Sequence, residues 1–124
     1  MRINKKKFIY LISPNKIERS FYNHLTEILK LNKVSFFQLR LKKVSFKKKI
    51  LIGKKIKEIC KDYNTKFLIN DDVLLAKKLN ADGCHLGQKD MKILNARKII
   101  KKKIIGITCH NSIKFAKLAI KNKA

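Results

Sequence analysis

Short, predominantly apolar runs alternate with segments of helical periodicity along the chain, and this alternation limits the available folds most. Five such runs predict strands at residues 8–12, 34–39, 66–69, 83–86 and 104–107. Their residues are apolar at consecutive rather than alternate positions, so we expect strands that are buried on both faces. Strands of this kind are typical of parallel sheets covered by helices.

An amphipathic helix is predicted after each run. The first has apolar residues at helical spacing, and Asn15 with Glu18 has the spacing of a capping box. The second carries one apolar stripe that includes Ile52 and Ile56. Three further helices are predicted to begin near Asp72, Met91 and Ser112. The repeated β-α order places the chain in the α/β class, as an open doubly wound sheet or as part of a barrel. The phosphate-binding motifs of open sheets, GxGxxG and GxxxxGK[ST], do not occur in the sequence.

The basic charge of the chain makes nucleic acid the first partner to consider. The sequence has 124 residues, enough for one domain, with 32 Lys and Arg against 8 Asp and Glu and a net charge of +24. However, 28 of the basic residues are Lys, and Lys, Ile and Asn, which all have A/T-rich codons, together supply 56 of the 124 residues. Specific base recognition favours Arg. We therefore expect no specific nucleic-acid partner.

The lengths of the apolar runs argue against a membrane protein or a secreted protein. Residues 8–12 form a run far shorter than the ~20 residues of a membrane span, and no signal-peptide cleavage site follows it. The three cysteines, Cys60, Cys84 and Cys109, contain no CxxC pattern, which disfavours a disulfide framework or a zinc site. These features lead us to expect no membrane partner and a cytoplasmic protein.

Polar residues collect directly after the predicted strands, where parallel α/β folds carry their sites. After the second strand, Gln38, Arg40 and Lys42 share one side, and their amide, guanidinium and ammonium groups suit phosphate oxygens. Ordinary solvated charges are the alternative for Arg40 and Lys42. Thr108 ends the fifth strand, either as a hydroxyl donor to a ligand or as a β-branched strand residue.

Acidic residues cluster in one short stretch of this basic chain. Four of the eight lie between residues 71 and 90: Asp71, Asp72, Asp82 and Asp90. Mg²⁺ is usually held by one or two carboxylates together with substrate phosphates, and two aspartates from adjacent strand ends would provide them. The alternative is that Asp71 or Asp72, and Asp90, cap the helices that follow.

Five motifs resemble, in order and spacing, those of the thiamine phosphate synthase family: YLISP at 10–14, QLRLK at 38–42, LIND at 68–71, ADGCHLGQKD at 81–90 and IGITCH at 105–110. The resemblance runs from about residue 8 to the last residue. It implies a (βα)₈ barrel, so the fold class becomes α/β, a partial TIM barrel with about five of eight βα units. It also implies a transferase of thiamine biosynthesis. That enzyme couples 4-amino-5-hydroxymethyl-2-methylpyrimidine diphosphate to thiazole phosphate and releases pyrophosphate.

The resemblance also assigns roles to individual residues. It implies that substrate is bound by Gln38, Leu39, Arg40, Leu41, Lys42, Asn70, His85 and Thr108. Arg40 and Lys42 would contact the diphosphate oxygens, and His85 would line the pyrimidine pocket. Asp71 and Asp90 would bind the cofactor Mg²⁺. Thr108 stands where the family commonly has Ser and keeps the hydroxyl.

The sequence ends after the fifth predicted helix. The resemblance places a further diphosphate-binding lysine and the thiazole-phosphate site in later units. We therefore expect residues 1–124 to form a single truncated domain with the pyrimidine-diphosphate and Mg²⁺ half-site, without full turnover by itself. Open sheet edges would favour self-association. Two alternatives stay open: a thiazole tautomerase-like protein, and a basic, non-catalytic nucleic-acid-binding protein. The intact donor and aspartate set favours the synthase.

Overall fold

Five parallel strands form one sheet in the computed structural model, which describes residues 7–124. The strands are β1 (Ile9–Ile12), β2 (Val34–Leu39), β3 (Lys66–Asn70), β4 (Gly83–Leu86) and β5 (Ile104–Ile107). The helices are α1 (Phe21–Leu29), α2 (Phe46–Asp62), α3 (Val73–Leu79), α4 (Ile93–Ile100) and α5 (Ile113–Lys121). The β-α order and the strand positions agree with those predicted from the hydrophobic pattern.

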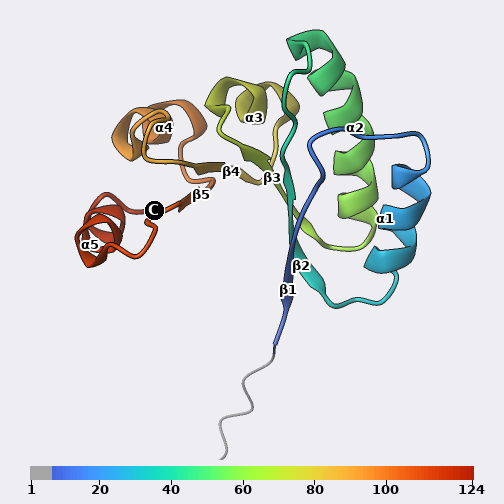
Figure 1. Ribbon diagram of the computed structural model, residues 1–124, viewed down its shortest axis with the longest axis horizontal. Coiled ribbons are helices and arrows are strands. Elements are labelled where there is room, and N and C mark those ends of the chain that lie inside the picture. The colour runs from blue at the N-terminus through green and yellow to red at the C-terminus, as the bar shows by residue number, and fades with distance from the viewer. Residues whose placement is uncertain (1–6) are drawn as a thin grey trace, which may run out of the picture.

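The strands lie side by side in chain order, β1-β2-β3-β4-β5, and every neighbouring pair is parallel. Figure 1 shows that they follow an arc, with the helices on its convex side. A doubly wound sheet would carry helices on both faces and reverse its strand order. The one-sided arc is the arrangement of part of a (βα)₈ barrel, which confirms the predicted fold class.

The hydrophobic core lies between the sheet and the helices. Phe37, Phe67, Ile69, Cys84 and Leu86 from the strands are buried with Leu25, Ile56, Ala76, Leu79 and Ala96 from the helices. The three residues in the middle of β3 are all buried, as expected for a central strand. For β1 the expected burial on both faces is wrong: Ile9 and Ile12 are 50% and 52% exposed. The reason is that β1 is an edge of the sheet and pairs only with β2.

The first helix also begins later than its capping-box spacing suggests. It starts at Phe21, preceded by Ser20, whose side chain makes no capping hydrogen bond. The Asn15 side chain instead accepts a hydrogen bond from Arg40 Nη1 at 2.7 Å. The Asn15 side chain therefore binds a residue just after β2 instead of capping the helix. Residues 13–20 form a loop at the carboxyl edge of the sheet.

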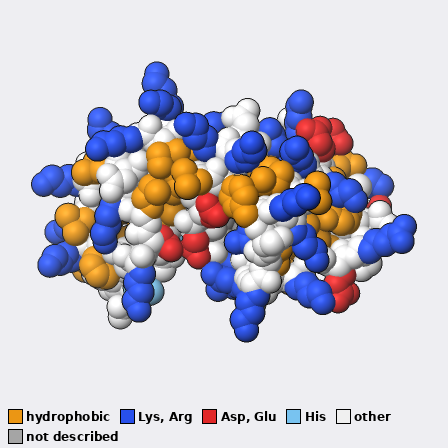
Figure 2. Space-filling model, turned by 90° about the horizontal axis from the view of Figure 1, so that it is seen from above, with side chains coloured by type: hydrophobic (Ala, Val, Ile, Leu, Met, Phe, Trp, Pro, Cys, Tyr) orange, Lys and Arg blue, Asp and Glu red, His pale blue; other side chains and the backbone are white. Residues whose placement is uncertain are grey.

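Lysine and arginine side chains spread over the whole of the face shown in Figure 2 and do not gather into one patch. This distribution agrees with a general Lys enrichment of the chain. Among the helices of residues 7–124, none combines the length and the apolar character needed to cross a membrane.

Candidate functional site

A carboxylate pair lies at the carboxyl edge of the sheet, after β3 and β4. The Asp71 and Asp90 side chains are near enough for each carboxyl group to shift the pKa of the other. Asp90 Oδ2 also accepts the backbone N–H of Gly87 at 2.7 Å. A Cβ at Gly87 would lie 2.9 Å from that same oxygen, so glycine leaves room for Asp90 to fold back on the loop. The two acids are 19 positions apart in sequence, and the adjacent β3 and β4 bring them together.

Lys42 completes this charged group from the neighbouring loop after β2. Its Nζ lies 3.1 Å from Asp71 Oδ2. The Asp71 backbone has a left-handed φ of 64°, and its N–H donates to the carbonyl oxygen of His85 at 2.8 Å. Such a conformation is uncommon outside glycine, although Asp tolerates it better than most residues. The tertiary hydrogen bond to His85 thus helps to hold Asp71 in the orientation that meets Lys42 and Asp90.

The two carboxyl groups differ in their proton affinity. Burial acts to raise the pKa of Asp71, but hydrogen bonds from Lys42 and with Asp90, and the Lys42 charge, lower that pKa overall. Burial raises the pKa of Asp90, and the hydrogen bond and charge of Asp71 raise it further, against the Gly87 amide. Two neighbouring carboxylates repel each other when both are charged, so a bound cation would stabilise the pair. Its oxygens suit a hard divalent cation such as Mg²⁺.

Helix capping is divided among other residues. Asp72 Oδ1 accepts the Leu75 N–H at 2.9 Å and caps α3. The residue that precedes α4 is Lys92 rather than Asp90, and it makes no side-chain cap. The capping alternative is therefore correct for Asp72 and wrong for Asp90, while Asp71 faces Lys42. No cluster of three or more His, Cys, Asp or Glu able to hold a metal occurs within residues 7–124. Two carboxylates thus fit Mg²⁺ only in company with ligand oxygens or water.

The polar residues after β2 are held by partners that sequence reasoning did not identify. Gln38 is buried, and its Nε2 donates to the Tyr10 hydroxyl at 2.9 Å. The Arg40 backbone N–H donates to Ser13 Oγ at 2.8 Å, while the Arg40 guanidinium bonds Asn15. Tyr10, Ser13 and Asn15 come from β1 and the loop that follows it. Ser13 and Asn15 lie just after the first apolar run, and that position was the available signal, because the loop there opens on the same sheet edge.

Leu39 and Leu41, predicted with this group, have a different environment. Their side chains are 2% and 7% exposed and belong to the hydrophobic core. Only Leu41 also borders a cavity at this edge. Of the polar side chains in this segment, Lys42 is the one that contacts Asp71, while Gln38 and Arg40 bond residues of β1 and the loop after it. The two leucines anchor the segment in the core.

A second polar group joins β4 to β5. His85 Nε2 lies 2.8 Å from Thr108 Oγ1, and Gln88 Nε2 donates to the Thr108 carbonyl oxygen at 2.7 Å. Burial lowers the pKa of His85, against the charges of Asp71 and Asp90, which favours a neutral imidazole near pH 7. Asn70 pairs with His85 across the sheet. The predicted residues Asn70, His85 and Thr108 thus lie along the ends of three consecutive strands.

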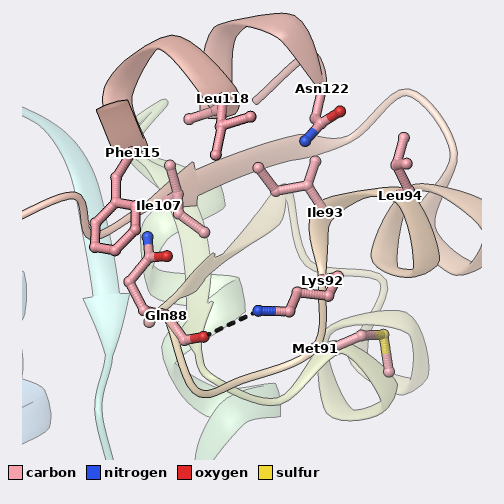
Figure 3. A pocket seen from close by; sticks show the side chains of 11 residues that line it. Gln88, Met91, Lys92, Ile93, Leu94, Ile107, Phe115, Leu118 and Asn122 are labelled. Carbon is pink, nitrogen blue, oxygen red and sulfur yellow. Dashed lines mark hydrogen bonds between the residues drawn. The ribbon is translucent and has the colours of Figure 1, made fainter. Parts of the chain in front are cut away.

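Two hollows adjoin these groups. One of about 470 Å³ borders the acids, with Lys42, Lys43, Lys49, Asn70, Asp71, Asp72 and Met91 among its lining residues. The other, of about 270 Å³, lies between α4, α5 and β5. Figure 3 shows Ile93, Ile107, Leu118 and Phe115 around this second hollow, and Gln88 at one end. The first is polar and charged, whereas the second is mainly apolar.

The chain resembles known proteins over nearly all of its length. Residues 9–124 match the family model for thiamine monophosphate synthase. A thiamine-phosphate synthase of Pelagibacter ubique is 65% identical over 127 aligned positions, covering 100% of this chain and 61% of the relative. That of Fusobacterium nucleatum is 42% identical, covering 83% and 51%. A solved thiamine phosphate pyrophosphorylase from Pyrococcus furiosus has a TM-score of 0.83 and 31% identity, covering 98% of this chain and 58% of that chain.

The chain thus spans between half and two thirds of the length of these relatives. The motifs lie on the matching part: the carboxylate pair, the segment after β2 and the His85–Thr108 contact all fall within residues 9–124. Sequence identity, fold and family model therefore lead to one conclusion, that this chain belongs to the thiamine monophosphate synthase family.

Proposed function

We propose that this chain binds the diphosphate of a pyrimidine substrate together with Mg²⁺ and serves as a transferase in thiamine phosphate formation. The observation that carries the proposal is the Asp71–Asp90 pair beside Lys42 at the carboxyl edge of a partial barrel. Family membership supports the same chemistry, because the matched relatives are named thiamine-phosphate synthases.

In the proposed reaction, the bond between the pyrimidine methylene carbon and the diphosphate oxygen breaks, and its electron pair leaves with pyrophosphate. The thiazole nitrogen then donates its lone pair to that carbon. No side chain has to remove a proton from the attacking nitrogen, which suits a site without an obvious nucleophile. Bound Mg²⁺, held by Asp71 and Asp90, would neutralise charge on the departing pyrophosphate.

The remaining residues would bind and orient. Lys42 would exchange its contact with Asp71 for a phosphate oxygen, and Arg40 would contribute a second cation. Gln38, Asn70, His85 and Thr108 would border the pyrimidine. A neutral His85 can accept or donate a single hydrogen bond to a heterocycle while it keeps its contact with Thr108.

Calorimetry with inorganic pyrophosphate at ~0.15 M salt, with and without Mg²⁺, tests the proposal; this salt concentration screens weak attraction by the many lysines. We expect saturable, Mg²⁺-dependent binding that Asp71→Asn and Asp90→Asn abolish. Asp62→Asn is the matched control, since Asp62 is exposed at the far end of α2. Equal weak binding by all four proteins, with no effect of Mg²⁺, would contradict the proposed site.

The other candidate functions receive less support. A thiazole tautomerase has no diphosphate to release, and the relatives named above are synthases and a pyrophosphorylase. A nucleic-acid-binding protein would show affinity that falls steeply with salt and does not depend on Asp71 or Asp90.

We further infer a cytoplasmic setting and association through the edge strands. Cys60 and Cys84 are free and buried, and burial raises the pKa of their thiols to about 12 and about 11, which keeps them protonated and unreactive. The edges β1 and β5 offer unpaired backbone groups within the described sheet. A sedimentation coefficient that rises with protein concentration would support the association.

A further inference from the structure

Lysine side chains line the cavity beside the carboxylate pair, and the proposed function assigns no role to two of them. Lys42, Lys43 and Lys49 all line this cavity of about 470 Å³, together with Asn70 and Asp71. Lys42 is paired with Asp71. Within residues 7–124, the ammonium groups of Lys43 and Lys49 have neither an ion pair nor a side-chain hydrogen bond. Lys49 is half-buried, so its charge is less well solvated than that of a fully exposed lysine.

The acidic residues that line the cavity do not form ion pairs with Lys43 or Lys49. Asp72 also lines it, but its carboxylate caps α3 through the Leu75 N–H. Asp71 already contacts Lys42 and Asp90. The cavity therefore offers two cations without a partner, directly next to a group suited to a divalent metal.

The place of Lys49 in its helix also opposes local stability. It lies in the first turn of α2, where its N–H donates to the Ser45 carbonyl oxygen at 2.9 Å, and this turn holds no acidic residue. A cation near the amino end of a helix is repelled by the helix dipole. An anion in the cavity would offset that repulsion.

We propose that Lys43 and Lys49 form a second binding wall for the diphosphate, which receives phosphate oxygens that Lys42 and the metal do not satisfy. This inference rests on the proposed function and deepens it. The ligand class is an organic diphosphate or inorganic pyrophosphate. Lys42 holds the ligand from the end of β2, and Lys43 and Lys49 hold it from the loop before α2 and from the first turn of α2.

Calorimetric titration of the 124-residue chain with pyrophosphate and Mg²⁺ tests this wall. The variants are Lys43→Gln and Lys49→Gln, with Lys48→Gln as the matched control. Lys48 lies in the same turn of α2 and its replacement changes the net charge equally, but Lys48 does not line the cavity. We expect Kd to rise about five-fold for each cavity variant and less than about two-fold for the control. These fold-changes correspond to the upper and lower ends of the contribution of an exposed ion pair.

Thermal melting separates a binding role from a structural one. Removal of a cation from the first turn of α2 should leave Tm unchanged or raise it slightly for both Lys48→Gln and Lys49→Gln. Weaker binding by Lys49→Gln without a lower Tm therefore supports the wall. If Lys49→Gln loses both binding and Tm relative to the control, its role is structural and the inference fails.

The failure of this inference can be told from failure of the proposed function. If the wild-type protein binds pyrophosphate with Mg²⁺, and Asp71→Asn abolishes binding while Lys43→Gln and Lys49→Gln match Lys48→Gln, only the wall is wrong. If wild-type binding shows no Mg²⁺ dependence but still weakens in Lys49→Gln, the wall stands and the proposed metal site is wrong. Absence of any wild-type binding overturns both.

Discussion

Replacement of Gly106 by Ala should break the contact between His85 and Thr108 without straining the backbone. A Cβ on Gly106 would lie 2.6 Å from His85 Nδ1, well inside van der Waals contact. Because the described glycines all have φ outside the left-handed region, Ala fits the backbone of β5. The imidazole must therefore move, and its 2.8 Å contact with Thr108 Oγ1 must lengthen or break.

The size of the effect follows from three contributions. A lost hydrogen bond costs about 1 kcal/mol, and crowding in a packed region costs about 1–3 kcal/mol. Ala in place of Gly in a strand returns roughly 0.5–1 kcal/mol. We expect Gly106→Ala to lower the free energy of unfolding by about 1–3.5 kcal/mol, with most of the loss due to His85.

A double-mutant cycle in urea measures this coupling. In a His85→Ala background the obstruction is gone, so Gly106→Ala should become neutral or stabilising, and the coupling energy should be at least about 1 kcal/mol. NMR titration gives a second measurement. Burial lowers the pKa of His85, so displacement of the ring towards water should raise that pKa towards the ordinary value of 6.5. Zero coupling together with an unchanged His85 titration would refute the steric argument.

Two further changes test the electrostatics and the packing. Asp90→Asn should raise the free energy of unfolding at pH 7 by roughly 0.5 kcal/mol. Because the pKa of Asp90 is raised in the folded protein, its contribution to stability is complete below pH 3.8 and is lost as pH rises through the folded pKa. The stability gained by Asp90→Asn should therefore vanish in acid. Urea denaturation at several pH values measures this gain, and a gain independent of pH would contradict the reasoning. Arg97→Ala should cost about 3 kcal/mol, because its guanidinium donates to the carbonyl oxygens of Lys101 at 2.7 Å, Lys103 at 2.5 Å and Lys123 at 2.6 Å. The same measurement on Lys98→Ala, an exposed neighbour, should show less than about 0.5 kcal/mol, and equal losses would exclude this role for Arg97.

The local pattern of the sequence was sufficient to predict the class of fold and the sheet edge at which the candidate site residues lie. Five apolar runs separated by amphipathic segments leave few solutions other than a parallel sheet covered by helices. Parallel strands bring their carboxyl ends to one edge, so residues 38–42, 70–71, 85 and 108 were expected to meet there. Asp71 with Lys42 and His85 with Thr108 are contacts of this kind.

The assignment of each polar side chain to a partner depended on the tertiary structure. Asp71 and Asp72 are adjacent and chemically identical, yet one caps a helix and the other meets Lys42, because the left-handed backbone at Asp71 turns them apart. Asn15 has the spacing of a local cap but binds Arg40 instead. These choices rest on contacts between residues distant in sequence.

Sequence by itself determined the α/β architecture, the shared sheet edge and the kinds of group found there, since hydrophobic periodicity acts over a few residues. Only the tertiary structure decided the exposure of β1, the unequal pKa values of Asp71 and Asp90 and the orientation of Lys43 and Lys49 towards one cavity. Exposure and proton affinity depend on the surroundings of a group in space, and those surroundings come from several loops at once.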